Sequence, residues 1–176
     1  MSKDAIVLTG VKETLKALQQ FDKDAVREFN KVVNSELGVA KKEALSFVTA
    51  EPPLSGWATQ PARNPRSRGG QGWPAWDQSI IRGGIKVSKA ERRVRSDYTT
   101  SAGGLLNKSA AGAIYEVAGR RNNRGVFVSN LENEEGNASR VVWKSVDKNK
   151  DRIQKSISNA LDKAKATLQK NLNRSE

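Results

Sequence analysis

The longest regular pattern of apolar positions lies between residues 23 and 49. Apolar residues follow one another there at steps of three or four, and most charged residues fall between them. This spacing predicts an amphipathic helix with one core-facing side, and packing of the same helix against a neighbouring subunit is compatible with it. The positions on this face are Val26, Phe29, Val33, Leu37, Ala40, Ala44 and Phe47.

A second helical pattern occupies the C-terminal part of the chain, over residues 147–172. Ile153, Ile157 and Leu161 keep helical spacing, and Asp147 is placed to cap the start of the helix. At the other end of the chain, the apolar run at residues 5–9 predicts a short strand. Residues 11–20 predict a short helix, because Val11, Leu15 and Leu18 follow at steps of four and three.

The middle of the chain favours strands. Apolar and polar residues alternate over residues 79–88 and again over 91–98, which predicts an antiparallel hairpin with its turn near residues 89–90. Residues 110–118 form an apolar segment that fits a helix or a strand, and residues 126–128 fit a short strand. One face of the hairpin would carry basic residues, either as a solvated sheet face or as a surface for DNA or an acidic partner. These residues are Arg82, Lys86, Arg93 and Arg95.

These elements predict an α+β fold in a single domain over residues 1–176. A long N-terminal amphipathic helix and a C-terminal helix would pack on a small antiparallel β-sheet. Residues 51–78 interrupt the pattern as an extended loop or arm, because all five prolines and several glycines fall there.

This loop also holds three of the four tryptophans, with arginines between them. Three interpretations remain open: an arm that docks on another subunit or partner, a loop folded over the chain's own core, and a stacking platform for single-stranded nucleic acid. The first makes the following residues candidates for a partner interface: Trp57, Trp73, Trp76, Arg63, Arg66 and Arg68.

Composition narrows the range of functions. The 176 residues contain no Cys and no His, which excludes thiol chemistry, a Ser-His-Asp triad and a His/Cys zinc site. We expect neither a catalytic constellation nor a bound cofactor or metal, and therefore no enzyme. No apolar run approaches the ~18 residues of a membrane span, so we expect no membrane partner. Hydrophobic residues make up only 36%, which favours a core completed by neighbouring subunits.

The net charge of +12 is concentrated in the middle of the chain. Residues 51–124 carry 13 basic and 5 acidic side chains, a net charge of +8. A basic segment attracts nucleic acid, acidic proteins or anionic membranes, and charge alone does not choose among them.

Four short motifs, in order, carry a family resemblance. Gly10-Val11 stands before the first helix, and Pro52-Pro-Leu-Ser-Gly56 stands in the loop. Ala113-Ile-Tyr-Glu-Val-Ala-Gly119 follows, and Arg140-Val-Val-Trp-Lys-Ser-Val146 precedes the last helix. This order resembles the neck, or tail-completion, protein family of long-tailed (siphovirus-type) bacteriophages. Two departures are the missing prolines of the fourth motif and the longer insertion between Trp57 and Trp76.

The resemblance implies a virion structural protein of the head–tail connector. Such a protein is assembled in the host cytoplasm and forms a homo-oligomeric ring, a hexamer or a dodecamer, around the DNA passage. Its neighbours would be head-completion or connector proteins and a tail terminator or tail tube. Alternatives are a tail terminator or minor tail protein, or a stand-alone basic nucleic-acid-binding module. Candidate DNA-facing residues are Arg82, Lys86, Arg93, Arg95, Arg120 and Arg121.

Overall fold

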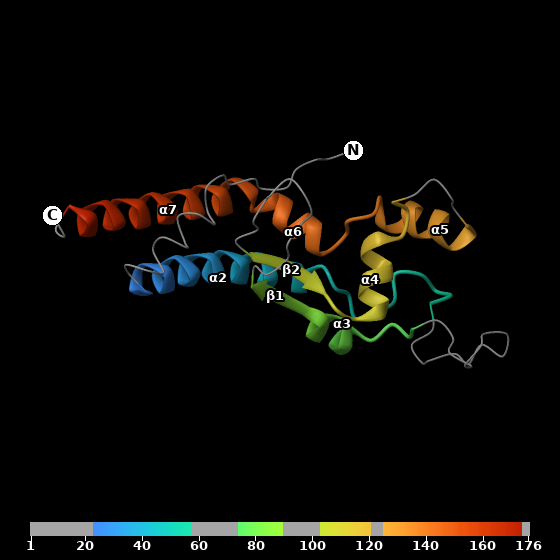
Figure 1. Ribbon diagram of the computed structural model, residues 1–176. Coiled ribbons are helices and arrows are strands. Elements are labelled where there is room, and N and C mark those ends of the chain that lie inside the picture. The colour runs from blue at the N-terminus through green and yellow to red at the C-terminus, as the bar shows by residue number, and fades with distance from the viewer. Residues whose placement is uncertain (1–22, 58–73, 90–102, 121–124, 174–176) are drawn as a thin grey trace. The chain divides into compact units, whose positions relative to one another are not determined.

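The fold consists of six helices and one small sheet in the part of the chain that the structure describes. The computed structural model describes residues 23–57, 74–89, 103–120 and 125–173. The helices are α2 (Lys23–Ser46), α3 (Gln78–Gly84), α4 (Ala110–Val117), α5 (Val126–Glu135), α6 (Val142–Lys148) and α7 (Lys150–Leu172). The strands are β1 (Ile85–Lys89) and β2 (Gly103–Asn107), which pair as a two-stranded antiparallel sheet (Figure 1). This mixture confirms the predicted α+β class.

The described residues divide into two compact units. Unit 1 comprises residues 23–39, 87–89, 103–104 and 148–173, and unit 2 comprises residues 40–57, 74–86, 105–120 and 125–147. Helix α2 and both strands contribute residues to each unit. The prediction of a single domain stays a prediction.

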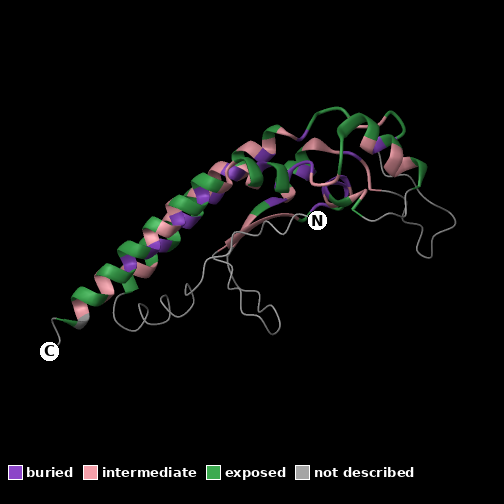
Figure 2. Cartoon of the chain, turned by 90° about the horizontal axis from the view of Figure 1, so that it is seen from above, coloured by how far each residue is buried: buried purple, intermediate pink, exposed green. Residues whose placement is uncertain are grey.

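Unit 1 is built on the N-terminal part of α2 and on α7, which run antiparallel (Figure 1). Phe29, Val33 and Leu37 of α2 are buried, and so are Ile153 and Ile157 of α7. Figure 2 shows buried residues recurring along both helices. The Nε of Arg152 lies 3.1 Å from Oε2 of Glu36, so an ion pair also joins the two helices. Both helices therefore fall within the predicted ranges 23–49 and 147–172. The predicted cap was wrong, because α7 begins at Lys150 after Asn149, and Asp147 belongs to the preceding helix α6.

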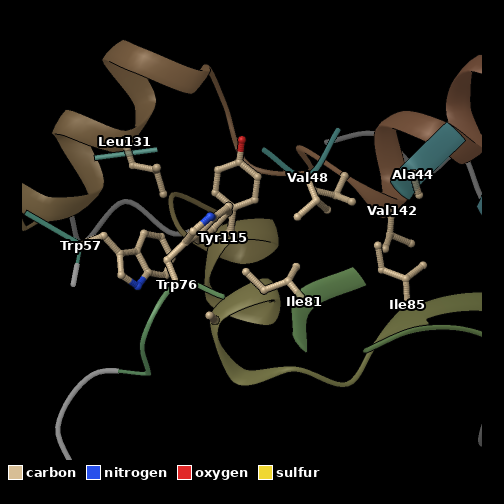
Figure 3. Close-up of a cluster of buried hydrophobic side chains, with 11 residues drawn as sticks. Ala44, Val48, Trp57, Trp76, Ile81, Ile85, Tyr115, Leu131 and Val142 are labelled. Atoms are coloured by element: carbon tan, nitrogen blue, oxygen red, sulfur yellow. The ribbon is translucent and has the colours of Figure 1, made fainter. Parts of the chain in front are cut away.

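Unit 2 holds a separate core that is rich in aromatic residues (Figure 3). Trp57 and Trp76 meet edge to face with their ring centroids 5.1 Å apart. Trp57 also meets Phe127 at 5.3 Å, and Trp76 meets Tyr115 at 5.2 Å. Such contacts add roughly 0.5–1.5 kcal/mol per pair to the free energy of burial. The aliphatic members of this core are Ala44, Val48, Ile81, Ile85, Ala111, Leu131, Val141 and Val142.

The predicted strand over residues 79–88 was wrong in its first half. Residues 78–84 form helix α3, and only residues 85–89 form a strand. The Asp77 side chain caps the helix by accepting the backbone N–H of Ile80 at 2.9 Å. Ile81 of α3 and Ile85, the first residue of β1, are both fully buried, and their four-residue step fits helical spacing as well as strand alternation.

Two other local predictions are settled by the helices that follow. The segment left open as helix or strand is α4, which Ser109 caps by accepting the N–H of Gly112 at 3.1 Å. The strand predicted at residues 126–128 was wrong, because these residues begin α5. Within the described residues β1 pairs with β2, and the predicted partner strand 91–98 lies outside them.

Candidate functional site

The most elaborate polar arrangement in unit 2 joins the end of α4 to the start of α6. Glu116, in the last turn of α4, is only 6% exposed. Its Oε2 accepts the backbone N–H groups of Val141 at 2.7 Å and Val142 at 3.1 Å, and its Oε1 accepts that of Trp143 at 2.9 Å. The first N–H groups of a helix lack partners within the helix. Glu116 supplies those partners for α6, together with the negative charge that a helix N-terminus favours.

Arg140 makes the complementary contacts at the C-terminal ends of two helices. It is 4% exposed, and its Nη1 donates to the carbonyl oxygens of Tyr115 at 2.7 Å and Ala118 at 3.0 Å. Its Nε and Nη2 donate to the Gly136 carbonyl oxygen at 3.0 and 2.7 Å. The guanidinium thus closes α4 and α5 at their negative ends. Burial lowers the pKa of Arg140, but a guanidinium remains charged in proteins.

Tyr115 links this arrangement to the aromatic core. Its hydroxyl donates to Oε2 of Glu135 at 2.8 Å, and the Cζ of Arg140 lies 5.6 Å from its ring centroid. Burial, and then the hydrogen bond to Glu135, raise the pKa of the Tyr115 hydroxyl, which therefore stays neutral and acts as a donor. We call Tyr115, Glu116, Glu135 and Arg140 the Glu116–Arg140 network.

The turns around the network depend on particular backbone geometries. Gly119 has a φ of +99°, a conformation that residues with a side chain rarely adopt, and a Cβ there would also lie 2.5 Å from Oε1 of Glu132. Ser139 has a φ of 82°, which is unusual for a residue with a side chain, and its N–H donates to the Glu116 carbonyl oxygen at 2.7 Å. These two residues bring the chain back so that residues 140–143 meet Glu116.

The network acts as a structural clamp. The Glu116 carboxylate accepts hydrogen bonds from backbone N–H groups, and the Arg140 guanidinium donates hydrogen bonds to backbone carbonyl groups. Within the described residues, no group of three or more acidic, His or Cys side chains is placed to hold a metal ion. The arrangement therefore fixes the ends of α4, α5 and α6 against one another.

Two tryptophans that were predicted to contact a partner are core residues. Trp57 is 4% and Trp76 is 2% exposed. The Trp57 indole N–H donates to the Pro74 carbonyl oxygen at 2.9 Å, and that of Trp76 donates to the Thr49 carbonyl oxygen at 3.2 Å. This corrects the predicted interface role, since both side chains are used inside this chain. The two described ends of the loop therefore agree with the second interpretation of the sequence, in which the loop folds over the core of its own chain. Trp73, Arg63, Arg66 and Arg68 lie outside the described residues.

The predicted DNA-facing residues are spread over several elements. Arg82 is exposed on α3, and Lys86 is exposed on β1. The Arg120 guanidinium lies over the ring of Trp143, 5.4 Å from its centroid, and its Nη2 donates to the Ser139 hydroxyl at 3.2 Å. Arg93, Arg95 and Arg121 lie outside the described residues. A DNA-facing role for these residues stays a prediction.

Sequence reasoning missed the pairing of Glu116 with residues 140–143, and it missed the exposure of Trp143. Glu116 and Arg140 were part of the motifs, but no role was predicted for them. A charged residue within an apolar helix, and an arginine directly before Val-Val-Trp, were the available signals. Trp143 is 48% exposed, although the two residues before it, Val141 and Val142, are buried.

Comparison with known proteins identifies no relative of this chain. No family model matches the chain, and no curated protein or solved structure matches it. Among the described helices, none is both long and apolar enough to cross a membrane.

Proposed function

We propose that this chain is a structural protein of the virion neck in a long-tailed bacteriophage. It would form a ring at the joint between the capsid connector and the tail, around the passage for genomic DNA. The observation that supports this proposal best is the Glu116–Arg140 network, because it joins the third and fourth motifs of the family resemblance.

The network gives physical meaning to the motif residues. Tyr115 and Glu116 of the third motif form hydrogen bonds with Glu135 of α5 and with the backbone of Val141, and Gly119 provides the turn with positive φ that follows α4. Arg140, the first residue of the fourth motif, in turn needs the carbonyl groups of Tyr115 and Ala118. Two short motifs that depend on each other are stronger support for a resemblance than two that match independently.

Exposed apolar side chains on unit 2 support a role in protein–protein contact. Val126 is 78% exposed, and Val117, Ile80 and Trp143 are also exposed. Trp143 is the largest of them, and Arg120 covers one part of its ring. Tryptophan and arginine are enriched among the residues that dominate interface energies. Trp143 with Arg120 therefore replaces Trp57 and Trp76 as the candidate partner contact.

The positive charge supports contact with passing DNA as a secondary role. Arg82 and Lys86 are exposed, and the middle segment carries a net charge of +8. Contacts between such side chains and phosphates are independent of base sequence and weaken as salt concentration rises.

A nonsense codon in the gene for this chain, in a phage that encodes it, tests the proposed function. We expect DNA-filled heads and separate tails that fail to join, with joining restored by the chain supplied in trans. Mass spectrometry of intact wild-type particles should detect the chain. Particles that lack the chain, or that assemble normally without it, would contradict the proposal. Completed heads with tails of irregular length would instead favour a tail terminator.

A further inference from the structure

Unit 2 presents a surface on which an exposed indole lies beside positive charge. Trp143 is 48% exposed, and Val117 is 47% exposed. Arg120 contacts both, because its backbone N–H donates to the Val117 carbonyl oxygen at 3.2 Å and its Cζ lies 5.4 Å from the centroid of the Trp143 ring. Lys144, the next residue after Trp143, is also exposed. We call Val117, Arg120, Trp143 and Lys144 the Trp143 surface.

The Trp143 surface is held in place by contacts within its own chain. The backbone N–H of Trp143 donates to Oε1 of Glu116 at 2.9 Å, and Nη2 of Arg120 donates to the Ser139 hydroxyl at 3.2 Å. Groups that are already fixed lose less conformational entropy when a partner binds. Exposed apolar side chains with polar groups around them are typical of protein interaction sites. The surface therefore suits a protein partner.

The two cations of this surface have no counter-charge among the described residues. Arg120 contacts the Trp143 ring and the Ser139 hydroxyl, and the Nζ of Lys144 lies 4.9 Å from the centroid of the Phe47 ring. Within the described part of the chain, neither forms an ion pair with a carboxylate. A partner that brings carboxylates to this surface would complement both cations.

Helix α5 carries the complementary features. Val126, its first residue, is 78% exposed, and Glu134, in its last turn, is exposed as well. Residues 132–135 contain three glutamates in four positions, the densest acidic run in a sequence with a net charge of +12. Two copies with this net charge repel each other unless the surfaces that meet have opposite signs. The acidic end of α5 is therefore the part of a second copy that complements the Trp143 surface.

We propose that α5 of a second copy docks on the Trp143 surface, with Glu134 opposite Arg120 and Lys144. The exposed Val126 adds apolar area to the same contact. Because the two surfaces differ, the contact is heterologous, and contacts of this kind form closed rings when the rotation between copies closes. The proposal rests on the self-association within the proposed function and adds which two surfaces meet.

Charge reversal in the full chain tests this contact. The variants are Arg120→Glu, Glu134→Lys and the two together. The matched control combines Arg120→Glu with Asp162→Lys, which gives the same net charge, and Asp162 is exposed on α7 in unit 1. Sedimentation equilibrium at low salt over a range of concentrations gives the apparent Kd of self-association. Thermal unfolding followed by tryptophan fluorescence checks that each variant remains folded.

We expect Arg120→Glu and Glu134→Lys each to raise the apparent Kd by about tenfold, since each places like charges opposite each other. The two together should restore the Kd of the natural chain, whereas the control pair should not. Lys144→Glu in place of Arg120→Glu repeats the test without removing the contact between Arg120 and the Trp143 ring.

Two results would overturn the proposal. Assemblies that respond equally to the double variant and to the control pair would show that other surfaces meet, and they would leave the neck function standing. A natural chain that does not associate with itself would contradict both. Restoration by Glu134→Lys alone among the second changes would support the contact even if the chain were absent from virions, a result that would contradict only the neck function.

Discussion

Replacing Glu116 by glutamine tests the clamp that joins the two motif segments. The glutamine keeps one oxygen, which can still accept the N–H groups of Val141 and Val142. Its amide nitrogen takes the place of Oε1, which accepts the Trp143 N–H at 2.9 Å, so two donors then face each other. The substitution also removes the negative charge at the start of α6.

The expected cost follows from these losses. A hydrogen bond to a charged group contributes about 1.5–3 kcal/mol, and a charge at a helix N-terminus contributes about 0.3–1 kcal/mol. We therefore expect Glu116→Gln to lower the free energy of unfolding of unit 2 by about 2–3 kcal/mol. In a chain of this size each kcal/mol lowers Tm by roughly 2–4 °C, so Tm should fall by roughly 5–10 °C.

Tryptophan fluorescence during thermal unfolding is the appropriate assay, because Trp57 and Trp76 lie in the core of unit 2. Glu134→Gln is the matched control: it makes the same change of charge at an exposed position on α5. The control should move Tm by little. If Glu116→Gln shifts Tm no more than Glu134→Gln does, the three hydrogen bonds contribute little and the reasoning is refuted.

Three further predictions follow from neighbouring contacts. Gly112→Ala should lower the free energy of unfolding by about 1–3 kcal/mol, because the Asn107 amide occupies the place of the new Cβ. Gly38→Ala should raise it by about 1 kcal/mol, because the space around Gly38 in α2 is open and alanine favours a helix. Equal effects of the two substitutions in urea unfolding would refute this. Tyr115→Phe should cost about 1 kcal/mol at neutral pH. Because the pKa of Tyr115 is raised in the folded chain, the stability that tyrosine adds over phenylalanine is lost as pH rises above about 10, where the unfolded chain releases a proton that the folded chain keeps. A stability difference between the two proteins that does not change with pH would contradict this. Arg140→Lys should lower the free energy of unfolding by about 1.5–3 kcal/mol, because one ammonium group cannot reach the carbonyl groups of both α4 and α5. A decrease in Tm of less than about 2 °C would argue against a guanidinium that bridges the two helices.

The helical parts of the fold were predictable wherever one periodicity persisted over many residues. The apolar face from Val26 to Phe47 and the spacing of Ile153 and Ile157 continue for several turns, and α2 and α7 follow them closely. Short segments were less predictable. Ile81 and Ile85 fit both the alternation of a strand and the spacing of a helix, and the Asp77 cap favoured the helix.

The candidate site could be predicted only as separate motifs. Glu116 and Val141 are 25 residues apart, and no local pattern indicates that a carboxylate at the end of one helix caps another. The tryptophans were misjudged for a related reason. Prolines and glycines around Trp57 and Trp76 indicate an irregular backbone, but an irregular backbone can still place two indoles in a core. Burial of this kind depends on the tertiary contacts with Tyr115 and Phe127.

The state of assembly of the purified full-length chain tests the proposed neck function most directly. Light scattering over a wide range of concentrations gives the mass, and negative-stain electron microscopy of the same sample gives the shape. We expect closed rings with a central opening, and Trp143→Ala should weaken them without unfolding the chain, since about half of the Trp143 surface is exposed. A protein that stays monomeric at the highest concentrations and forms no rings would contradict the account.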